Sequence, residues 1–386
     1  MGVFLPQQDT PVPEDLAAYQ QRGGYEGLRR AERMDPLEIV AAVEASDLLG
    51  RGGAGFPTGR KWRMVAEAPA GTRYLVVNGA EGEPGSYKDR TLMARAPHRV
   101  LEGVLIAARA LSASAVIFYV NDEFQAALAA LTTAWAEIGR AGLAAVPLTL
   151  VPETHVYIAG EETALINVLM HEPAQPWHKP PYPSQKGYRG APTVVNNVET
   201  LAAAALVLER GPDWFRAERP ALFSLSGDVR APGVYELALG TPLADLLAVG
   251  GGARPGSELV AVLPGGYSMP PILPPDFGVA LEASALRAIG SGLGASIIAV
   301  GSDRGLGSML QEVLDFFARE SCGKCPVCVK GSQIMAERAR VLLRPAATAA
   351  DAAEFLSIAR KYRHKGICAF LDTAAHVAES TAPRLF

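Results

Sequence analysis

Between residues 74 and 151, short runs of apolar and β-branched side chains alternate with longer stretches of helical spacing, and this alternation constrains the fold more than any other feature. Residues 74–77, 115–120 and 146–151 are expected strands, and the stretches 100–111 and 122–142 are expected helices. Strands that alternate with helices of this length form a parallel sheet covered on both faces. The sequence therefore predicts an α/β fold for the first large domain.

A glycine-rich stretch, residues 50–62 (GRGGAGFPTGRKW), precedes the first expected strand. Five of its first ten residues are glycine. Glycines at this density let the backbone approach a ligand closely or adopt positive φ. Phosphate, held by backbone N–H groups beside Arg51, Arg60 and Lys61, is the ligand that this pattern favours. A glycine-rich surface turn is the alternative.

Gly50, Gly52 and Gly55 also fit the dinucleotide fingerprint G-x-G-x-x-G, which requires a strand before it and a helix at its end. The preceding residues 36–45 have helical spacing, and we expect Pro57 and Gly59 to interrupt any helix directly after the loop. On this context the fingerprint is not assigned.

Three polar clusters follow expected strands or open helices in the same domain: residues 78–89 (NGAEGEPGSYKD), 157–164 (YIAGEETA) and 193–200 (TVVNNVET). Segments at the carboxyl ends of strands are where α/β folds bind ligands. Amides and carboxylates of this kind also serve as turn caps, but three such clusters in one domain favour a polar ligand.

The rest of the chain divides by pattern. Residues 1–35 are expected to form a surface lead-in without chemistry, and residues 36–215 the α/β domain. Residues 216–302 contain short expected strands (223–227, 233–237, 259–263 and 295–300) with one helix at 242–248, which predicts a small α+β module. Residues 303–386 are expected to form a helical bundle, with capping boxes at Ser308/Gln311 and Thr348/Asp351.

The four cysteines are the strongest local signal. Cys322, Cys325 and Cys328 are separated by two-residue spacers, and Cys368 arrives from a distant segment. This spacing is typical of a 4Fe-4S cluster, whereas structural zinc usually shows two separated pairs. Zinc and free thiols remain the alternatives. Lys324, Lys330 and Lys365 flank the cysteines and would offset the negative charge of a cluster and raise its potential.

Composition limits the partners. A net charge of −4 and a pI of about 5.9 argue against nucleic acid or an anionic membrane as partner. The N-terminus lacks the pattern of an export signal, and no apolar run is long enough to span a membrane. Few cysteines, three of them within seven residues, indicate a reducing compartment. We expect a cytoplasmic protein without direct membrane insertion.

Four motifs occur together and in order: RGGAGFPTGRKW, NGAEGEPGSYKDR, AGEETALINVL continuing through KPPYP to PTVVNNVETLA, and ESCGKCPVC with the later Cys368. Between about residues 37 and 368 the chain resembles the F-type flavoprotein subunit of respiratory complex I and its relatives in NAD-linked formate dehydrogenases and hydrogenases. The resemblance implies a Rossmann-like domain that binds FMN and NAD, a ubiquitin-like β-grasp domain of the soluble-ligand-binding type, and a helical bundle that holds the 4Fe-4S cluster.

The resemblance also implies residue roles. Glu83 would contact the nicotinamide and act in catalysis, while Glu162 would contact the adenosine ribose and favour NAD over NADP. The cluster ligands would be the four cysteines. The shared nucleotide and flavin cleft would be lined by Gly50, Gly52, Gly53, Phe56 and Lys61, and FMN would be held by Asn78, Tyr157, Gly160, Glu161, Asn196, Asn197 and Thr200.

The chain departs from the family pattern inside the expected cofactor cleft. Ala80 stands where the family usually has an acidic residue, and larger side chains replace two glycines of the segment before Tyr157, where His155 is found. Met64 replaces an aromatic that helps to stack the nicotinamide, and Tyr182 replaces a phenylalanine. His155 is either a new flavin contact or a bystander. These changes affect the expected NADH site while the cluster motif is intact.

The sequence thus predicts an enzyme subunit that passes a hydride from NADH to FMN and single electrons through a 4Fe-4S cluster. Its four cysteines are used once, so a partner must take the electrons. The resemblance implies a thioredoxin-like 2Fe-2S subunit and a larger iron-sulfur subunit, through which the protein could sit on the cytoplasmic face of the inner membrane. A paralogue with another electron donor and a non-catalytic scaffold that keeps the cluster are the rival hypotheses.

Overall fold

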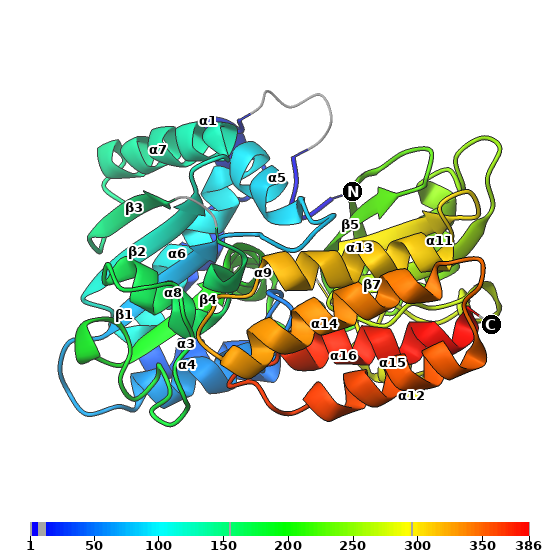
Figure 1. The fold of residues 1–386 in the computed structure, drawn as a ribbon. Helices are drawn as coiled ribbons and strands as arrows, with labels where there is room; N and C mark the ends of the chain where they lie inside the picture. The colour runs from blue at the N-terminus through cyan, green and yellow to red at the C-terminus, as the bar shows by residue number, and fades with distance from the viewer. Residues whose placement is uncertain (1, 7–12, 154–155, 295, 386) are drawn as a thin grey trace.

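A computed structural model describes residues 2–6, 13–153, 156–294 and 296–385 of the chain, so His155 lies outside the described residues. Figure 1 shows three units: an α/β unit, a smaller unit with a mixed sheet, and a layer of long helices that lies against both.

The first sheet is parallel and has the strand order β3-β2-β1-β4. Its strands are β1 (Tyr74–Gly79), β2 (Ala115–Asn121), β3 (Leu148–Glu153) and β4 (Thr193–Asn197). The three expected strands are confirmed. The fourth was expected only as a polar cluster, and it pairs with β1 so that Asn78 lies opposite Asn197. Both amides therefore reach the same edge of the sheet.

Helices cover both faces of this sheet, and an apolar cluster of helix and strand side chains forms the contact on each face. The larger cluster includes the buried faces of α6 and α9, and the smaller one includes α8 on the other face. The helices of the unit are α3 (Pro36–Ala45), α4 (Thr58–Ala66), α5 (Lys88–Arg95), α6 (Pro97–Leu111), α7 (Gln125–Arg140), α8 (Glu162–Leu169), α9 (Val198–Arg210) and α10 (Pro212–Glu218), with the short 3₁₀ turns η1 (Tyr157–Gly160) and η2 (Tyr188–Gly190).

The expected break after the glycine loop is wrong, because α4 begins at Thr58, directly after Pro57. Pro57 lies at the cap position, where its missing N–H costs nothing. A Cβ at Gly59 would come within 2.5 Å of the backbone nitrogen of Glu44. This glycine therefore lets α4 pack closely against α3. The element before the loop is a helix, as expected, and not a strand.

The N-terminal residues are more deeply buried than a surface lead-in. Tyr19 of helix α1 (Leu16–Gln21) and Tyr25, directly before helix α2 (Glu26–Ala31), belong to the largest of the apolar clusters described, and Phe4 joins them there. The Tyr19 hydroxyl donates to Glu102 of α6, and the Tyr25 hydroxyl lies 2.8 Å from Nδ1 of His98. The polar composition of this segment concealed these buried side chains.

The second unit contains a mixed sheet of order β6-β5-β8-β7, in which only the β5–β8 pair is parallel. The short strands and the helix expected here are present, with strands longer than their apolar runs. Its elements are β5 (Pro220–Gly227), β6 (Gly233–Ala238), α11 (Leu243–Val249), β7 (Leu259–Tyr267), η3 (Pro274–Asp276), α12 (Ala283–Ala288) and β8 (Ser296–Gly301).

The C-terminal unit consists of α13 (Gly305–Arg319), α14 (Pro326–Leu342), α15 (Ala349–Tyr362) and α16 (Phe370–Thr381), followed by η4 (Ala382–Arg384). The capping box of Thr348 and Asp351 is confirmed. The one expected at Ser308 is wrong, because α13 begins one turn earlier at Gly305. No helix among the described residues combines the length and apolar character needed to cross a bilayer.

Candidate functional site

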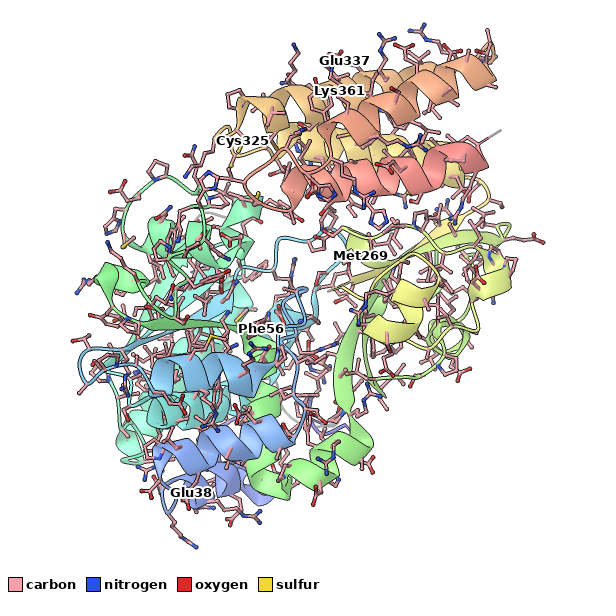
Figure 2. All side chains as sticks on the ribbon, turned by 90° about the horizontal axis from the view of Figure 1, so that it is seen from below. Glu38, Phe56, Met269, Cys325, Glu337 and Lys361 are labelled. Carbon is pink, nitrogen blue, oxygen red and sulfur yellow. The ribbon has the colours of Figure 1, made fainter. Side chains whose placement is uncertain are left out.

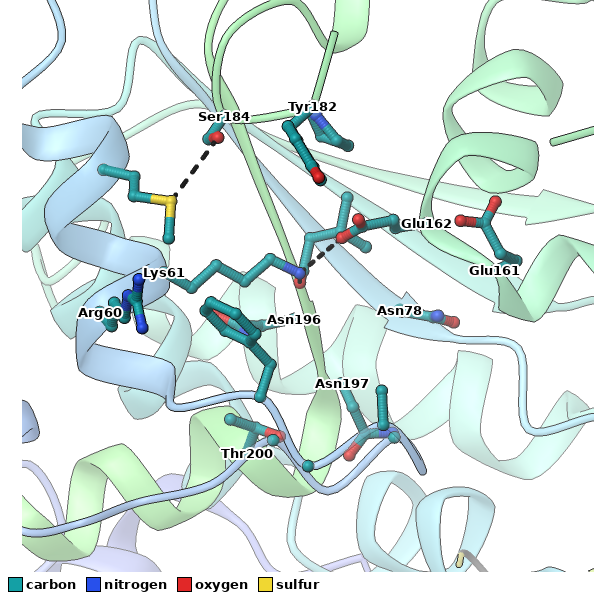
Figure 3. A pocket seen from close by; sticks show the side chains of 18 of the residues that line it. Arg60, Lys61, Asn78, Glu161, Glu162, Tyr182, Ser184, Asn196, Asn197 and Thr200 are labelled. Atoms are coloured by element: carbon teal, nitrogen blue, oxygen red, sulfur yellow. Dashed lines mark hydrogen bonds and ion pairs between the residues drawn. The ribbon is translucent and has the colours of Figure 1, made fainter. Parts of the chain in front are cut away.

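A cavity of about 880 Å³ opens where the glycine loop and α4 face the carboxyl ends of β1 and β4 (Figure 3). Twelve of the residues expected at the cofactor cleft line it: Gly50, Gly52, Phe56, Lys61, Asn78, Gly160, Glu161, Glu162, Tyr182, Asn196, Asn197 and Thr200. The remaining three, Gly53, Glu83 and Tyr157, line an adjacent cavity of about 290 Å³. The structure thus brings all fifteen together around two neighbouring cavities.

The glycine loop presents open backbone to these cavities. Gly53 and Gly55 have φ values of +111° and +63°, and a Cβ built on either would meet no heavy atom within 4 Å. Arg51 fixes the loop to α9, because its backbone N–H donates to Thr200 Oγ1 at 2.8 Å and its guanidinium pairs with Glu199 at 3.0 Å. This conformation suits a phosphate or a flat ring system that approaches the backbone itself.

Two lysines and two glutamates form an ion-pair chain along the larger cavity. Lys61 Nζ lies 2.6 Å from Glu162, and Lys179 Nζ lies 2.7 Å from Glu162 and 3.0 Å from Glu161. Burial raises the pKa of Glu162, but Lys61 and Lys179 outweigh it and hold the pKa below the ordinary value. Glu162 is therefore ionised and its carboxylate is fixed at the cavity wall (Figure 3).

Amide side chains are fixed by hydrogen bonds at the edge of the first sheet. Asn196 Oδ1 accepts from the buried Trp62 indole at 2.7 Å, and Asn78 Nδ2 donates to the Gly160 carbonyl at 3.1 Å. Asn197 Nδ2 donates to Asp89 at 2.6 Å. These amides are held in single orientations toward the cavities, as a preorganised ligand site requires.

Apolar and aromatic side chains form the mouth of the larger cavity. Phe56, Met64 and Tyr182 all line it and remain 42%, 41% and 51% exposed. The two departures at Met64 and Tyr182 therefore keep an apolar wall on which a base or nicotinamide ring could stack. Ala80, the third departure, is 1% exposed and packs in the apolar cluster under α8.

Glu83 lies at the junction of the three units, in the smaller cavity. Its carboxylate accepts hydrogen bonds of 2.9 Å from the hydroxyls of Tyr157 and Ser268, and one of 3.1 Å from the Ser268 backbone. Burial raises the pKa of Glu83 to about 7, although these hydrogen bonds favour the charged form. The side chain can thus change its charge near neutral pH.

Sequence reasoning missed Lys179, Ser268 and Asp89, which line the cavities beside the expected residues. Lys179 stands in the quoted KPPYP motif, which offered a signal for it. Ser268 comes from the end of β7 in another unit, and no local pattern around it indicates a site.

The four cysteines line a third cavity, of about 10 Å³, together with Ile158 and Phe370. Cys322 and Cys325 precede α14, Cys328 lies in its first turn, and Cys368 precedes α16. Among the described residues, no group of three or more metal-binding side chains is arranged to hold a single ion. Four cysteines around one cavity can hold a single metal group, and the two-residue spacers of the first three are typical of a 4Fe-4S cluster.

The second and third cavities share Ile158, Cys368 and Phe370 as lining residues, and the first and second share Asn78, Gly160 and Asn197. A continuous series of lining residues therefore connects the glycine loop with the cysteines. A ligand in the first two cavities would lie one side-chain layer from a cluster in the third.

Comparisons with known proteins match each unit separately. Residues 43–206 match the family described as the Nuo51 FMN-binding domain, residues 222–271 the SLBB domain, and residues 308–384 the NADH-ubiquinone oxidoreductase-F iron-sulfur binding region.

Whole-chain comparisons agree with these matches. The chain is 40% identical to an F-type subunit of NADH-quinone oxidoreductase in Rhizobium meliloti, in an alignment that covers 85% of this chain and 82% of that protein. It is 32% identical to the F-type subunit of the Aquifex aeolicus enzyme over 99% of this chain and 92% of the relative.

A crystal structure of an NAD⁺-reducing [NiFe]-hydrogenase in the H₂-reduced state aligns with a TM-score of 0.85 and 35% identity, covering 96% of this chain. This chain spans 64% of the length of that hydrogenase chain. Because it is 40% and 32% identical to these two F-type subunits over 85% and 99% of its length, the chain belongs to the family of F-type subunits of NADH-quinone oxidoreductase.

Proposed function

We propose that this chain oxidises NADH at the two larger cavities and passes single electrons through a cluster at the four cysteines to a partner protein. The observation that carries the proposal is the continuous series of cavities from the glycine loop to the cysteines. When bound, FMN supplies the conversion of a hydride into two single electrons, and the 4Fe-4S cluster carries them one at a time.

We assign each group of lining residues to the part of the ligand that its chemistry suits. The open amides of the glycine loop and the cation of Lys61 suit the phosphates, and the fixed amides of Asn78, Asn196 and Asn197 suit the polar edge of the flavin. Tyr157, Gly160, Glu161 and Thr200 complete the proposed FMN site. Gly50, Gly52, Gly53 and Phe56 line the cleft that FMN shares with NADH, and Tyr182 supplies its apolar mouth.

Glu83 and Glu162 are the proposed NADH contacts. Glu83, held by Tyr157 and Ser268, would orient the nicotinamide for hydride transfer from a fixed position. The ionised Glu162 would accept hydrogen bonds from the adenosine ribose and repel a 2′-phosphate, which favours NADH over NADPH. Cys322, Cys325, Cys328 and Cys368 would hold the cluster.

We infer finer features of the architecture on the same basis. The parallel sheet supports a Rossmann-like interpretation of residues 36–215, and the mixed sheet with α11 supports a β-grasp for residues 216–302. The proposed partners are a thioredoxin-like 2Fe-2S subunit and a larger iron-sulfur subunit. They would place the protein peripherally at a membrane in a quinone-reducing complex, or beside a hydrogenase in a complex like the one it matches.

An anaerobic absorbance spectrum tests the proposal. The reconstituted protein is measured before and after one equivalent of NADH, and we expect bleaching of the flavin bands together with the EPR signal of a reduced cluster. Flavin that stays oxidised with NADH but bleaches with dithionite would contradict NADH oxidation and indicate another donor. Protein that binds the cluster but no flavin would indicate a scaffold.

A further inference from the structure

The helical unit has the opposite charge to the rest of the chain. Residues 303–386 contain 12 Lys and Arg against 9 Asp and Glu, a net charge of +3, although the whole chain carries −4. The excess lies near the cysteines. The segments 322–330 and 360–368, which contain all four cysteines, together hold six Lys and Arg and no Asp or Glu.

These two segments lie side by side in the structure. Tyr362, at the end of α15, packs against Gly331 in the early part of α14, where an added Cβ would come within 2.7 Å of the tyrosine ring. Lys330 directly precedes Gly331 in the sequence, and Lys361 directly precedes Tyr362. Figure 2 shows Cys325 at one end of the helical unit and Lys361 on its outer side.

These two neighbouring segments carry five cations that we call together the basic face: Lys324, Lys330, Arg360, Lys361 and Lys365. All five are exposed, and none makes an ion pair with a carboxylate of the described residues. Lys324 Nζ donates to the Pro176 carbonyl at 2.7 Å. The sixth cation, Arg363, pairs with Glu379 at 3.4 Å.

The same helices also carry acidic residues, and in the view of Figure 2 Glu337 lies beside Lys361. Glu337 is in the middle of α14, and Asp351 and Glu354 are in the first part of α15, where Glu354 pairs with Arg338. His364 pairs with Asp372 of α16 at 3.2 Å. Positive charge thus gathers at the cysteine end of the two antiparallel helices.

Helix capping explains only part of this pattern. Arg360 and Lys361 lie in the last turn of α15, where cations are favoured by the helix dipole. Lys324 and Lys330 lie just before and within the beginning of α14, where the dipole disfavours them. Their position therefore has another cause. Offset of the cluster charge, expected from the sequence, is one, and their exposure also leaves them accessible to a group from outside the chain.

We infer that the basic face is the docking surface for an acidic protein that takes electrons from the cluster. The inference rests on the proposed function, because electrons must leave a chain whose four cysteines supply a single cluster. Cys322, Cys325 and Cys368 are only half-buried, so the edge of the cavity lies close to the surface. Cations around an exit point accelerate association with an acidic partner and fix its orientation.

Stopped-flow kinetics on the full chain, reconstituted with FMN and cluster, test the inference. The acceptors are cytochrome b5, an acidic haem protein, and cytochrome c, a basic one, at ionic strengths from about 0.01 M to about 0.5 M. We expect electron transfer to cytochrome b5 to be at least about tenfold faster at low salt than at high salt. A rate to cytochrome c that equals or exceeds it at low salt would overturn the inference.

Matched charge reversals locate the surface. The double variant Lys330→Glu/Lys361→Glu is expected to lower the low-salt rate to cytochrome b5 about tenfold and to remove most of its salt dependence. The control Arg287→Glu/Arg344→Glu changes the net charge equally at exposed positions away from the cysteine end and should stay within about twofold of the original rate. Equal losses in both variants would overturn the inference.

Two further outcomes distinguish docking from other roles of these cations. If the double variant changes only the midpoint potential of the cluster, with the salt dependence intact, the cations tune the cluster and do not dock a partner. If it loses binding to phosphatidylserine vesicles but not the fast rate to cytochrome b5, the face is a membrane contact. Pre-reduction with dithionite keeps the docking test independent of NADH oxidation, which flavin bleaching measures separately.

Discussion

Gly160 lines both larger cavities, and a Cβ built on it would meet no heavy atom within 4 Å. Its φ lies outside the left-handed range, so alanine fits its backbone without strain. The only space that a methyl group would occupy here is the proposed flavin site. A substitution at this residue therefore separates ligand binding from folding.

We predict that Gly160→Ala weakens FMN binding by about tenfold or more while the Tm of the flavin-free protein stays unchanged. Fluorescence titration of the apoprotein with FMN measures the first, and circular dichroism the second. Gly139→Ala in α7 is the control, because its Cβ also meets nothing within 4 Å but lies away from the cavities. It should bind FMN normally and gain about 0.5–1 kcal/mol of stability. Equal FMN affinities in the two variants would contradict the site.

Glu83 makes stability depend on pH. Its pKa rises from 4.5 to about 7 on folding, so the folded state holds the proton more tightly than the unfolded state. The resulting stabilisation is present in full below the unfolded pKa and is lost as pH rises through the folded pKa. We predict that Tm falls between about pH 4.5 and about pH 7 by more in the original protein than in Glu83→Gln. Parallel Tm curves for the two proteins would rule out this titration.

For single residues, the sequence predicted correctly that side chains inside the quoted motifs line the cavity. Gly50, Lys61 and Glu162 stand inside quoted motifs, and all three line the larger cavity. Ser268 could not be predicted, because it meets Glu83 only after β7 folds against another unit. The motif predicts Ala80 in the cofactor cleft, but its methyl group packs in the apolar cluster under α8.

At the scale of elements, a buried ion cluster joins the glycine loop to three other segments. Glu199, at the start of α9, pairs with Arg51 of the loop at 3.0 Å and with Lys88 of α5 at 2.8 Å, and it accepts from the backbone of Leu222 in β5 at 2.9 Å. Burial raises the pKa of Glu199, but Arg51 and Lys88 outweigh it and hold the pKa below its ordinary value. The cluster therefore positions the loop through charge as well as packing.

We predict that Glu199→Ala destabilises the protein by about 3–5 kcal/mol, because it takes the paired carboxylate from the mostly buried Arg51 and leaves the buried Lys88 with Asp89 alone. Thermal unfolding followed by circular dichroism measures the loss. Glu354→Ala removes the exposed pair with Arg338, at 53% and 47% side-chain exposure, and should cost no more than about 1 kcal/mol. Comparable losses in the two variants would show that burial of the cluster does not matter.

Element prediction from the sequence succeeded where the pattern was long and periodic, as in α6 and α7. It failed for β4, since Asn196 and Asn197 end the strand with polar side chains and the proline-rich passage before it offers no repeat. It also failed at α4, where Pro57 and Gly59 look like breakers. There Pro57 caps the helix, and the missing side chain of Gly59 allows close packing on α3.

At the scale of the whole molecule, the N-terminal residues connect two units. The backbone N–H groups of Val3, Phe4 and Leu5 all donate to the carboxylate of Glu236 in β6. Farther on, Tyr19 and Tyr25 are fully buried against α6. This segment spans the α/β unit and the mixed-sheet unit although its composition indicated only a surface lead-in.

We predict that deleting residues 1–33 prevents stable folding. Each large apolar side chain contributes about 1.5–3 kcal/mol when buried, and the deletion removes several, against a total stability of about 5–15 kcal/mol. Solubility on expression and circular dichroism of any soluble fraction measure the outcome. Tyr19→Phe, which keeps the ring but loses the hydrogen bond to Glu102, should fold with a lower Tm. A soluble deletion with the original Tm would contradict the assignment.

The position of β4 also orders events during synthesis. β4 pairs with β1 at the edge of the sheet and carries Asn196 and Asn197 of the site. It is also the last of the four strands in the sequence, so it is translated last. The loop at residues 50–62 stays without its anchor at Thr200 until that segment leaves the ribosome. We therefore expect the chain to bind flavin only after this strand has been synthesised. When FMN is scarce, we expect the domain to fold and its site to stay without flavin.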